Sequence, residues 1–217
     1  PYTVCLRNLR ISKHNVEKFS IVGPILPNEI NPQPKDRFLS QYGMDPDKET
    51  VYALLSGPIS ERLSAARLLL RLLPPLSQEY NVFMSLGTPR MNSEPLRKNG
   101  LLVFPWLPDR FSAINASDAV ICLGGHQTIM ECIYFGKPML LMPTPQHSEK
   151  TFNAMRAEEI GAGIFLKRDK LTASTLKHMI SLLMKEHFRR RLSELSSIAR
   201  RTKAVRTITK LLEAVGN

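Results

Sequence analysis

The sequence has few cysteines, few aromatic residues and no long apolar run. Its three cysteines, Cys5, Cys122 and Cys132, are odd in number and have apolar neighbours. This argues against a disulfide framework and favours a reducing, cytoplasmic setting. No signal-peptide pattern is recognised. Arg71 and several prolines interrupt the longest apolar stretches before they approach the ~20 residues of a membrane-spanning helix. We therefore expect a globular protein that does not span a membrane.

Acidic residues are scarce as well. The chain has 30 Lys and Arg against 19 Asp and Glu, which gives a net charge of +11. Such an excess raises nucleic acid, anionic membranes and phosphate-bearing ligands as partners. Nine of the basic residues stand between Lys185 and Lys210, where only Glu186 and Glu194 oppose them. A solvated helical face and a surface that meets anionic lipid both fit this pattern.

Prolines set the first 37 residues apart from the rest. A strand-like run at residues 19–22 is followed by Gly23 and four prolines, a spacing typical of a linker. We expect residues 1–37 to be an interdomain segment and linker, and residues 38–217 to be one domain with C-terminal helices over residues 172–217. A chain cut from a longer protein would begin in this way, and so would one that has lost an initiator methionine.

Apolar runs and helical patterns alternate from residue 50 onward. Strands are predicted over "TVYALLSG", "NVFMSLG", "GLLVFPW", "DAVICLGG", "PMLLMP" and "GAGIFL". Helices are predicted over residues 59–73, 127–135 and 149–160, and from residue 172 to the end. Continuous apolar strands that alternate with helices are typical of a parallel sheet covered on both faces. The predicted fold is an α/β doubly wound parallel sheet, which binds ligands at the carboxyl ends of its strands.

Two glycines stand between a predicted strand and a predicted helix. Gly124 and Gly125 lack a Cβ, so we expect positive φ and close approach of a ligand at this turn. The helix that follows directs its free N–H groups and the positive end of its dipole to the same place. The result is an anion site suited to a diphosphate, made by the backbone N–H groups of His126, Gln127 and Thr128.

Glu131 lies three residues after Thr128 and therefore on the same helical face. A carboxylate beside a phosphate site can accept hydrogen bonds from the two hydroxyls of a ribose, as acidic residues do in dinucleotide-binding folds. The residues alone also allow a second interpretation, in which the helix dipole favours an early carboxylate by up to about 1 kcal/mol.

A longer series of motifs makes the segment more specific. It consists of G-G-x-x-T-x-x-E from Gly124, "GKP" at residues 136–138, Pro143, E-K-x-x-N-A from Glu149 and E-x-G-A-G from Glu159. In this order the segment resembles the donor-binding domain of GT-B glycosyltransferases, the Rossmann-like C-terminal half of the MurG-like, family 28 type. The resemblance covers roughly residues 50–170 and is strongest over residues 101–163.

The resemblance implies how a nucleotide would be held. The backbone N–H groups at the start of the helix would bind the diphosphate, and Glu131 would hold the ribose hydroxyls. In "FPWLP", Trp106 would pack beside the base and the backbone of Leu107 would pair with uracil. Without the motifs downstream, Trp106 would fit a core position at least as well.

The resemblance also implies contacts at the sugar end. Ser56 and Gly57 match the loop that lies by the phosphates and the acceptor, and Glu149 and Lys150 would meet the sugar hydroxyls. Two positions depart from the pattern. Leu123 stands where many relatives carry His or Arg, so the backbone must do more of the phosphate binding. Lys150 replaces the usual glutamine, and it either favours a charged sugar or points to solvent.

Other candidate sites are weaker. Asp45 and Asp47 in "DPD" match a metal-binding D-x-D, but they follow a polar stretch rather than a buried strand, so a turn or cap fits better. The five histidines lack metal-ligand spacing, and no Ser/His/Asp arrangement is supported. His147, close to Glu149, either lines the sugar pocket or caps a turn. We expect neither a metal nor a cofactor.

The sequence therefore predicts a donor domain that binds a UDP-sugar such as UDP-GlcNAc. It would serve metal-independent, inverting transfer to an acceptor held by an N-terminal domain or a separate subunit. A lipid-linked acceptor would suit the basic helices and a place at the inner face of the membrane. The catalytic base would lie outside this chain, which is expected to transfer nothing by itself.

Two alternatives stay open. A UDP-GlcNAc 2-epimerase-like enzyme would share the architecture and the nucleotide site. A non-catalytic module could instead bind nucleic acid or another anionic ligand through the basic helices. The basic residues lie away from the motif strands and lack interleaved aromatic residues, which argues against nucleic acid.

Overall fold

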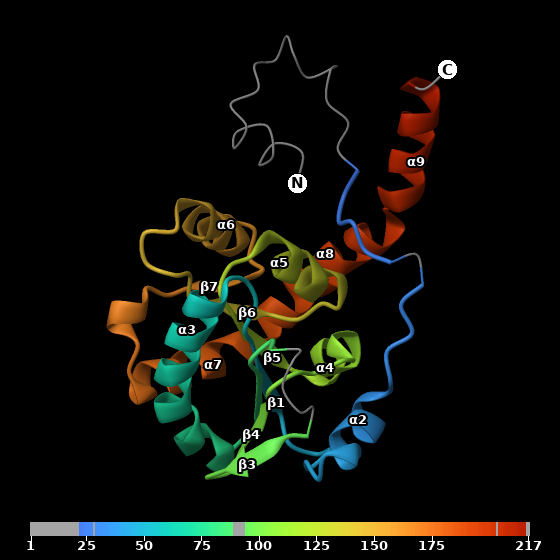
Figure 1. The fold of residues 1–217 in the computed structure, drawn as a ribbon. Helices are drawn as coiled ribbons and strands as arrows, with labels where there is room; N and C mark the ends of the chain where they lie inside the picture. The colour runs from blue at the N-terminus through green and yellow to red at the C-terminus, as the bar shows by residue number, and fades with distance from the viewer. Residues whose placement is uncertain (1–21, 28, 89–93, 203, 216–217) are drawn as a thin grey trace.

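A seven-stranded sheet crosses the structure, with helices on both of its faces (Figure 1). The computed structural model describes residues 22–27, 29–88, 94–202 and 204–215. The strands are β1 (Thr50–Leu54), β2 (Asn81–Ser85), β3 (Leu96–Lys98), β4 (Leu101–Phe104), β5 (Ala119–Cys122), β6 (Met139–Leu141) and β7 (Gly163–Phe165). Their order is β3-β4-β2-β1-β5-β6-β7, and each neighbouring pair is parallel except β3–β4. The predicted doubly wound α/β fold is confirmed.

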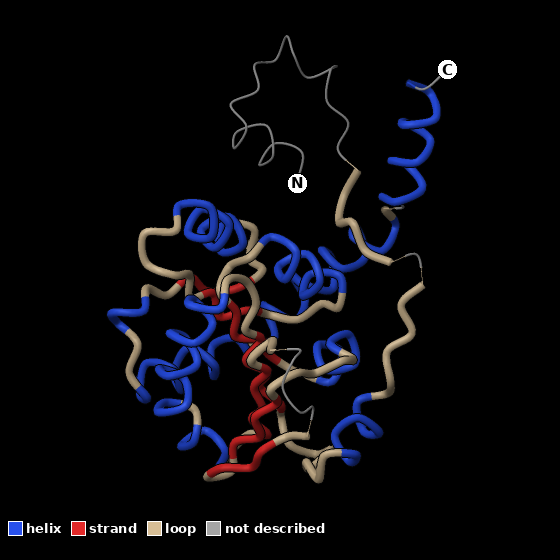
Figure 2. The backbone as a smooth tube through the Cα atoms, in the orientation of Figure 1, coloured by secondary structure: helices blue, strands red, loops and turns tan. Residues whose placement is uncertain are grey.

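Helices connect β1 to β2 and each strand from β4 to β7 to the next, and they continue beyond the last strand (Figure 2). They are α2 (Lys35–Gln41), α3 (Ile59–Leu72), α4 (Arg110–Ala116), α5 (His126–Tyr134), α6 (Ser148–Glu159), α7 (Ala173–Leu183), α8 (Glu186–Arg201) and α9 (Ala204–Val215). Two short 3₁₀ helices cover Pro74–Gln78 and Arg168–Lys170.

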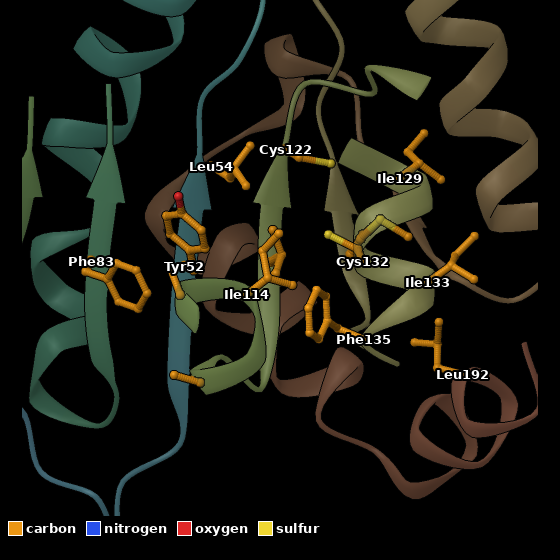
Figure 3. Packing of buried hydrophobic residues seen from close by; sticks show 14 of the residues in the cluster. Tyr52, Leu54, Phe83, Ile114, Cys122, Ile129, Cys132, Ile133, Phe135 and Leu192 are labelled. Atoms are coloured by element: carbon orange, nitrogen blue, oxygen red, sulfur yellow. The ribbon is translucent and has the colours of Figure 1, made fainter. Parts of the chain in front are cut away.

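Each face of the sheet has its own apolar core. Successive side chains of a strand point to opposite faces, so Val51 enters the core under α3 and α7, whereas Tyr52 enters the core under α2, α4, α5 and α8. In the second core Tyr52 stacks on Phe83 of the neighbouring strand, with ring centroids 4.4 Å apart (Figure 3). Burial on both faces explains why the strands are continuously apolar in the sequence.

The elements that the sequence did not predict are short. β3 has three exposed residues at the edge of the sheet, and α2 and α4 have seven residues each. About two helical turns are too few to show a clear apolar period. The predicted helices and strands lie at the expected positions, with boundaries shifted by a few residues, as is usual for element ends.

The segment before the domain has no regular structure between residues 22 and 34 in its described part, and α2 begins at Lys35, ahead of the expected boundary at residue 38. The strand-like run at residues 19–22 lies, except for Val22, outside the described residues. Leu26 is buried, and the carbonyl of Ile25 accepts a hydrogen bond from Gln127 Nε2 (3.2 Å). The segment is thus held against the start of α5.

The basic C-terminal helices use several arginines for contacts within the chain. On α8, Arg189 pairs with Glu49 (2.8 Å), Arg191 donates to the Ile160 carbonyl (2.8 Å), and Arg200 donates to the Tyr134 carbonyl (3.0 Å). α9 extends beyond the body of the domain (Figure 1). Among the described residues, no helix combines the length and the apolar character needed to cross a membrane.

Candidate functional site

The site lies where the order of the sheet reverses. The chain builds β1, β2 and β4 toward one edge and then returns to add β5, β6 and β7 on the other side of β1. Ligands of doubly wound folds bind at this switch point, outside the carboxyl ends of the strands. The loops that follow β1 and β5 flank a cavity of about 530 Å³ at this place. Its lining includes all the predicted site residues except Gly124 and Lys150: Ser56, Gly57, Trp106, Leu107, Gly125, His126, Gln127, Thr128, Glu131 and Glu149.

The first turn of α5 forms one wall of the cavity. The helix begins at His126 after Gly125, which provides no side-chain cap. Within the part of the chain that the structure describes, the first backbone N–H groups are thus left for an external acceptor. Thr128 Oγ1 lies 3.1 Å from Ser56 Oγ, which links this turn to the loop after β1. Free N–H groups together with the positive end of a helix dipole make a site for an anion.

The two glycines of this turn differ in their roles. Gly124 has φ +77°, and a Cβ there would lie 2.7 Å from the carbonyl oxygen of Lys150. Its own carbonyl accepts a hydrogen bond from Asn153 Nδ2 (3.2 Å), so this glycine serves the packing of α6. Gly125 has φ −66° and lines the cavity. The expected positive φ is therefore present at Gly124 only, and close approach to a ligand is open only to Gly125.

Glu131 is the acidic residue of the same wall. Its side chain is 2% exposed, and Oε1 pairs with Arg110 Nη2 (2.7 Å) and accepts a hydrogen bond from Gln127 Nε2 (3.3 Å). Burial raises the pKa of Glu131 above its ordinary value, although the charge of Arg110 and the hydrogen bond from Gln127 act in the opposite direction. Among the described residues, no hydrogen bond is formed by Oε2, which leaves this oxygen as an acceptor for a ligand.

The loop after β4 adds two apolar residues to the lining of the cavity. Leu107 is buried, whereas Trp106 is 38% exposed and lies at the rim. Within the described residues, the backbone N–H and C=O of Leu107 make no hydrogen bond, so both are available to a partner. Tyr52 lies deeper, where its hydroxyl and Ser85 Oγ are 2.7 Å apart. Burial raises the pKa of the Tyr52 phenol well above its ordinary value, so it stays neutral.

Lys150 lies outside the cavity. Its ammonium group donates to Glu61 Oε2 (2.5 Å), and the same oxygen accepts from Thr144 Oγ1 (2.6 Å). Burial disfavours the charge of Glu61, but the hydrogen bonds and the charge of Lys150 outweigh it and lower the pKa of Glu61. Lys150 is only 7% exposed. It therefore does not point to solvent, which corrects that expectation, and its charge is paired with Glu61. Its effect on the choice of sugar stays a prediction.

Two other expectations are decided by hydrogen bonds. His147 Nδ1 accepts from the Lys150 N–H (3.4 Å), so His147 caps the start of α6. Asp45 Oδ1 accepts from the Asp47 N–H (3.0 Å) in a turn that precedes β1, at the opposite edge of the sheet from the cavity. The described residues include no group of three or more His, Cys, Asp or Glu side chains that could hold a metal.

Two arginines of the cavity were not predicted from the sequence. Arg62, in the first turn of α3, and Arg110, at the start of α4, both contribute to the lining. Neither belongs to a recognised motif, and the partners of each lie on other elements of the fold. Sequence spacing carried no signal for them.

We expect that replacing Arg110 with methionine will make ligand binding more sensitive to acid. Burial already raises the pKa of Glu131, and loss of the neighbouring guanidinium should raise it further. An ionised Glu131 accepts hydrogen bonds, so affinity is retained above this pKa and lost as the pH falls through it. The loss should therefore begin at a higher pH in the variant than in the wild type.

The measurement is calorimetric titration of UDP between pH 8 and pH 5 into the wild type, Arg110→Met and Arg37→Met. Arg37 is an exposed residue of α2 and serves as the matched control. Phosphate groups of the ligand also titrate, but equally for each protein. Parallel pH profiles for all three proteins would show that Arg110 does not control the charge of Glu131.

The family is indicated by comparison with known proteins. Residues 63–211 match the model of the glycosyltransferase family 28 C-terminal domain, which is more than half of the chain. An uncharacterized glycosyltransferase of Methanosarcina acetivorans is 28% identical over 98% of this chain and 54% of its own length. A transferase of Alkaliphilus metalliredigens is 33% identical over 53% of this chain and 32% of its own length. Its name is UDP-N-acetylglucosamine–N-acetylmuramyl-(pentapeptide) pyrophosphoryl-undecaprenol N-acetylglucosamine transferase.

Solved structures share the fold. The glycotransferase of kitacinnamycin superimposes with a TM-score of 0.71 at 19% identity, over 91% of this chain and 50% of that one. The calicheamicin glycosyltransferase CalG4 gives a TM-score of 0.65 at 19% identity, over 93% and 50%. The chain spans about half the length of the first curated relatives it matches. It is similar to the C-terminal half of GT-B enzymes, and it belongs to the glycosyltransferase family 28 C-terminal domain family.

Proposed function

We propose that the chain is the donor-binding domain of a glycosyltransferase and that its donor is a UDP-sugar, UDP-GlcNAc or a close relative. One observation carries the proposal: the first turn of α5 and the buried carboxylate of Glu131 line one cavity at the switch point of the sheet. A nucleoside diphosphate needs both features, an anion site and an acceptor for the ribose hydroxyls.

The nucleotide would extend across the cavity from α5 to the loop after β4. The diphosphate would accept hydrogen bonds from the N–H groups of His126, Gln127 and Thr128, and the ribose would donate to Glu131. The base would lie beside Trp106, with uracil paired to the free backbone groups of Leu107. A pyrimidine edge needs one donor and one acceptor close together, which a single backbone residue supplies.

The sugar would lie near Ser56 and Gly57 in the loop after β1 and near Glu149 in the first turn of α6. Lys150 is neutralised by Glu61, so the nearby lysine adds no attraction for an acidic sugar. We therefore propose an uncharged sugar. The donor UDP-GlcNAc is favoured because the relative from Alkaliphilus metalliredigens is named for transfer of N-acetylglucosamine from it.

The chemical contribution of this domain would be stabilisation of the leaving diphosphate. Charge builds up on the diphosphate as the bond to the sugar breaks, and N–H donors already in place stabilise that charge. We propose inverting, metal-independent transfer, with the catalytic base and the acceptor held by a preceding domain or a separate subunit. The acceptor would be lipid-linked, as the name of the same relative indicates for that protein.

The test is calorimetric titration of UDP, UDP-GlcNAc, UDP-glucuronate and GDP into the chain. We expect the uridine nucleotides to bind, UDP-GlcNAc to bind more tightly than UDP-glucuronate, and GDP to bind at least tenfold more weakly than UDP. Incubation with UDP-GlcNAc should yield neither transfer nor epimerisation. Equal binding of GDP and UDP would contradict the proposed site for the uracil ring. Sugar transfer by this chain alone would contradict the proposal that the catalytic base lies outside it.

The same samples separate the two alternatives. Conversion of UDP-GlcNAc to a second UDP-sugar without an acceptor would identify an epimerase. Binding of single- or double-stranded oligonucleotides that weakens steeply with salt and does not depend on Glu131 would identify a nucleic-acid module. The ion pairs of Arg189 with Glu49 and of Arg191 with Glu194 leave fewer unpaired charges on α8 for such a role.

A further inference from the structure

Arg62 lines the cavity and contacts two of the loops beside it. It lies in the first turn of α3, and its guanidinium group reaches the loops that follow β1 and β2. Nε donates to the carbonyl of Gly57 (2.8 Å), and Nη1 donates to the carbonyl of Leu86 (2.6 Å) and also contacts the carbonyl of Gly87. One side chain thus connects two loops at the carboxyl edge of the sheet.

The glycines of these loops allow the guanidinium to come close. Gly57 has φ +106° and Gly87 has φ +66°, a region in which a side chain is strained. A Cβ at Gly87 would lie 2.9 Å from the carbonyl oxygen of Leu55 and 3.1 Å from Arg62 Nη1. The lack of a side chain at Gly87 therefore leaves room for the guanidinium, whereas a Cβ at Gly57 would lie 2.9 Å from Lys150 Nζ.

Among the described residues, no carboxylate forms an ion pair with Arg62. Its partners in the described residues are backbone carbonyls and, at 3.5 Å, the hydroxyl of Thr88. The other arginine of the lining, Arg110, is paired with Glu131. Glu149 also lines the cavity, but it forms no ion pair with Arg62. A cation held by neutral carbonyls at the wall of a cavity retains its attraction for an anionic ligand.

The sequence lacks a basic residue directly before the glycine pair, where Leu123 stands and is buried. A diphosphate bound only by the N–H groups of α5 would carry most of its charge uncompensated. We propose that Arg62 supplies the positive charge for the diphosphate and, by connecting the two loops, fixes the wall opposite the start of α5. This inference depends on the proposed function, because it assigns a residue to the phosphate end of the same site.

The experiment compares ligands that differ only in phosphate. Uridine, UMP and UDP are titrated by calorimetry into the wild type, Arg62→Met, Arg62→Lys and Arg67→Met. Arg67 lies on the same helix, is exposed and has no ion pair within the described residues, so it is the matched control. Thermal unfolding of each protein shows whether the fold is retained.

For Arg62→Met we expect UDP affinity to fall by about 10- to 100-fold, the usual range for loss of charge-assisted hydrogen bonds. Uridine affinity should change less than threefold, and the fall in affinity between low and high salt should become shallower. Arg62→Lys should keep part of the preference for UDP over uridine. Arg67→Met should behave as the wild type does.

Other outcomes would overturn the inference. An equal loss for uridine and UDP in Arg62→Met would mean that Arg62 only holds the loops in place. No loss for UDP would mean that the N–H groups of α5 suffice. If the wild type binds neither uridine nor UDP, the proposed function itself is refuted. The titration of the wild type alone shows this result, so it cannot be confused with an effect of a variant.

Discussion

Glu131→Ala is expected to lower the affinity for UDP by about 100-fold while the domain stays folded. A carboxylate that accepts two hydrogen bonds from a ribose contributes through charged acceptors, each worth about 1.5–3 kcal/mol. Glu131 is buried at the wall of the cavity and has one oxygen without a hydrogen bond in the described residues. Alanine removes both acceptors and also leaves Arg110 without its partner, so the loss should be large.

Stability should change much less than binding. Burial raises the pKa of Glu131, so the folded state disfavours its ionised form relative to the unfolded chain. The stabilising contribution of such a group is present at low pH and is lost as the pH rises through its raised pKa. The alanine variant gives up a buried carboxyl group whose ionised form the fold disfavours. We expect its melting temperature to stay within a few degrees of the wild type.

Calorimetric titration of UDP and thermal unfolding check this prediction together. Glu186→Ala, at the exposed start of α8, is the control for loss of an acidic residue. Glu131→Gln keeps the shape of the side chain and one neutral acceptor. Its affinity for UDP should lie between those of Glu131→Ala and Glu186→Ala. Wild-type affinity in Glu131→Ala would rule out a ribose at this carboxylate.

The fold could be predicted from the sequence because the strands are buried on both faces. Each central strand is then an uninterrupted apolar run, and the helices between them show an apolar period. The edge strand β3 has three exposed residues and pairs with β4 through its backbone. Its side chains therefore carry no pattern, and the same holds for the two-turn helices α2 and α4.

The wall formed by α5 could be predicted because its residues follow one another in the chain. Glycine before a helix start and a carboxylate one turn later give a local pattern with a physical meaning. Lys150 shows where such local reasoning ends. Its partner Glu61 lies 89 residues away, on another helix, so only the folded structure shows that the two charges neutralise each other.

Arg62 and Arg110, like Lys150, have surroundings that only the folded structure shows. Arginines are frequent in this chain, and nothing in the spacing of these two distinguishes them from the solvated ones. They line the cavity because α3 and α4 start at the carboxyl edge of the sheet, beside the loops that flank it. A switch point collects side chains from segments far apart in the sequence, and which ones it collects depends on where each helix begins.

Gly124 and Gly125 give a second prediction with a large expected effect. Alanine at Gly124 should mainly lower stability, whereas alanine at Gly125 should mainly weaken UDP binding. Gly124→Ala is expected to destabilise the fold by about 3 kcal/mol, because alanine is strained at positive φ and its Cβ would lie 2.7 Å from a backbone oxygen, that of Lys150. For a domain of this size the melting temperature should fall by about 6–12 °C. Gly125→Ala has φ −66° and meets nothing closer than 3.9 Å, so its melting temperature should stay near that of the wild type.

For UDP affinity the order should be reversed, with Gly125→Ala affected more than Gly124→Ala. At 15 °C, where both variants are still folded, Gly125→Ala places a methyl group at the start of α5 and should weaken UDP binding by about tenfold. Gly124→Ala, if α6 moves only slightly to relieve the contact, should lose less affinity than Gly125→Ala. Thermal denaturation followed by circular dichroism and titration of UDP give the two quantities. Equal melting temperatures would show that the contact with Lys150 does not constrain Gly124, and unchanged UDP affinity in Gly125→Ala would move the phosphate away from the start of α5.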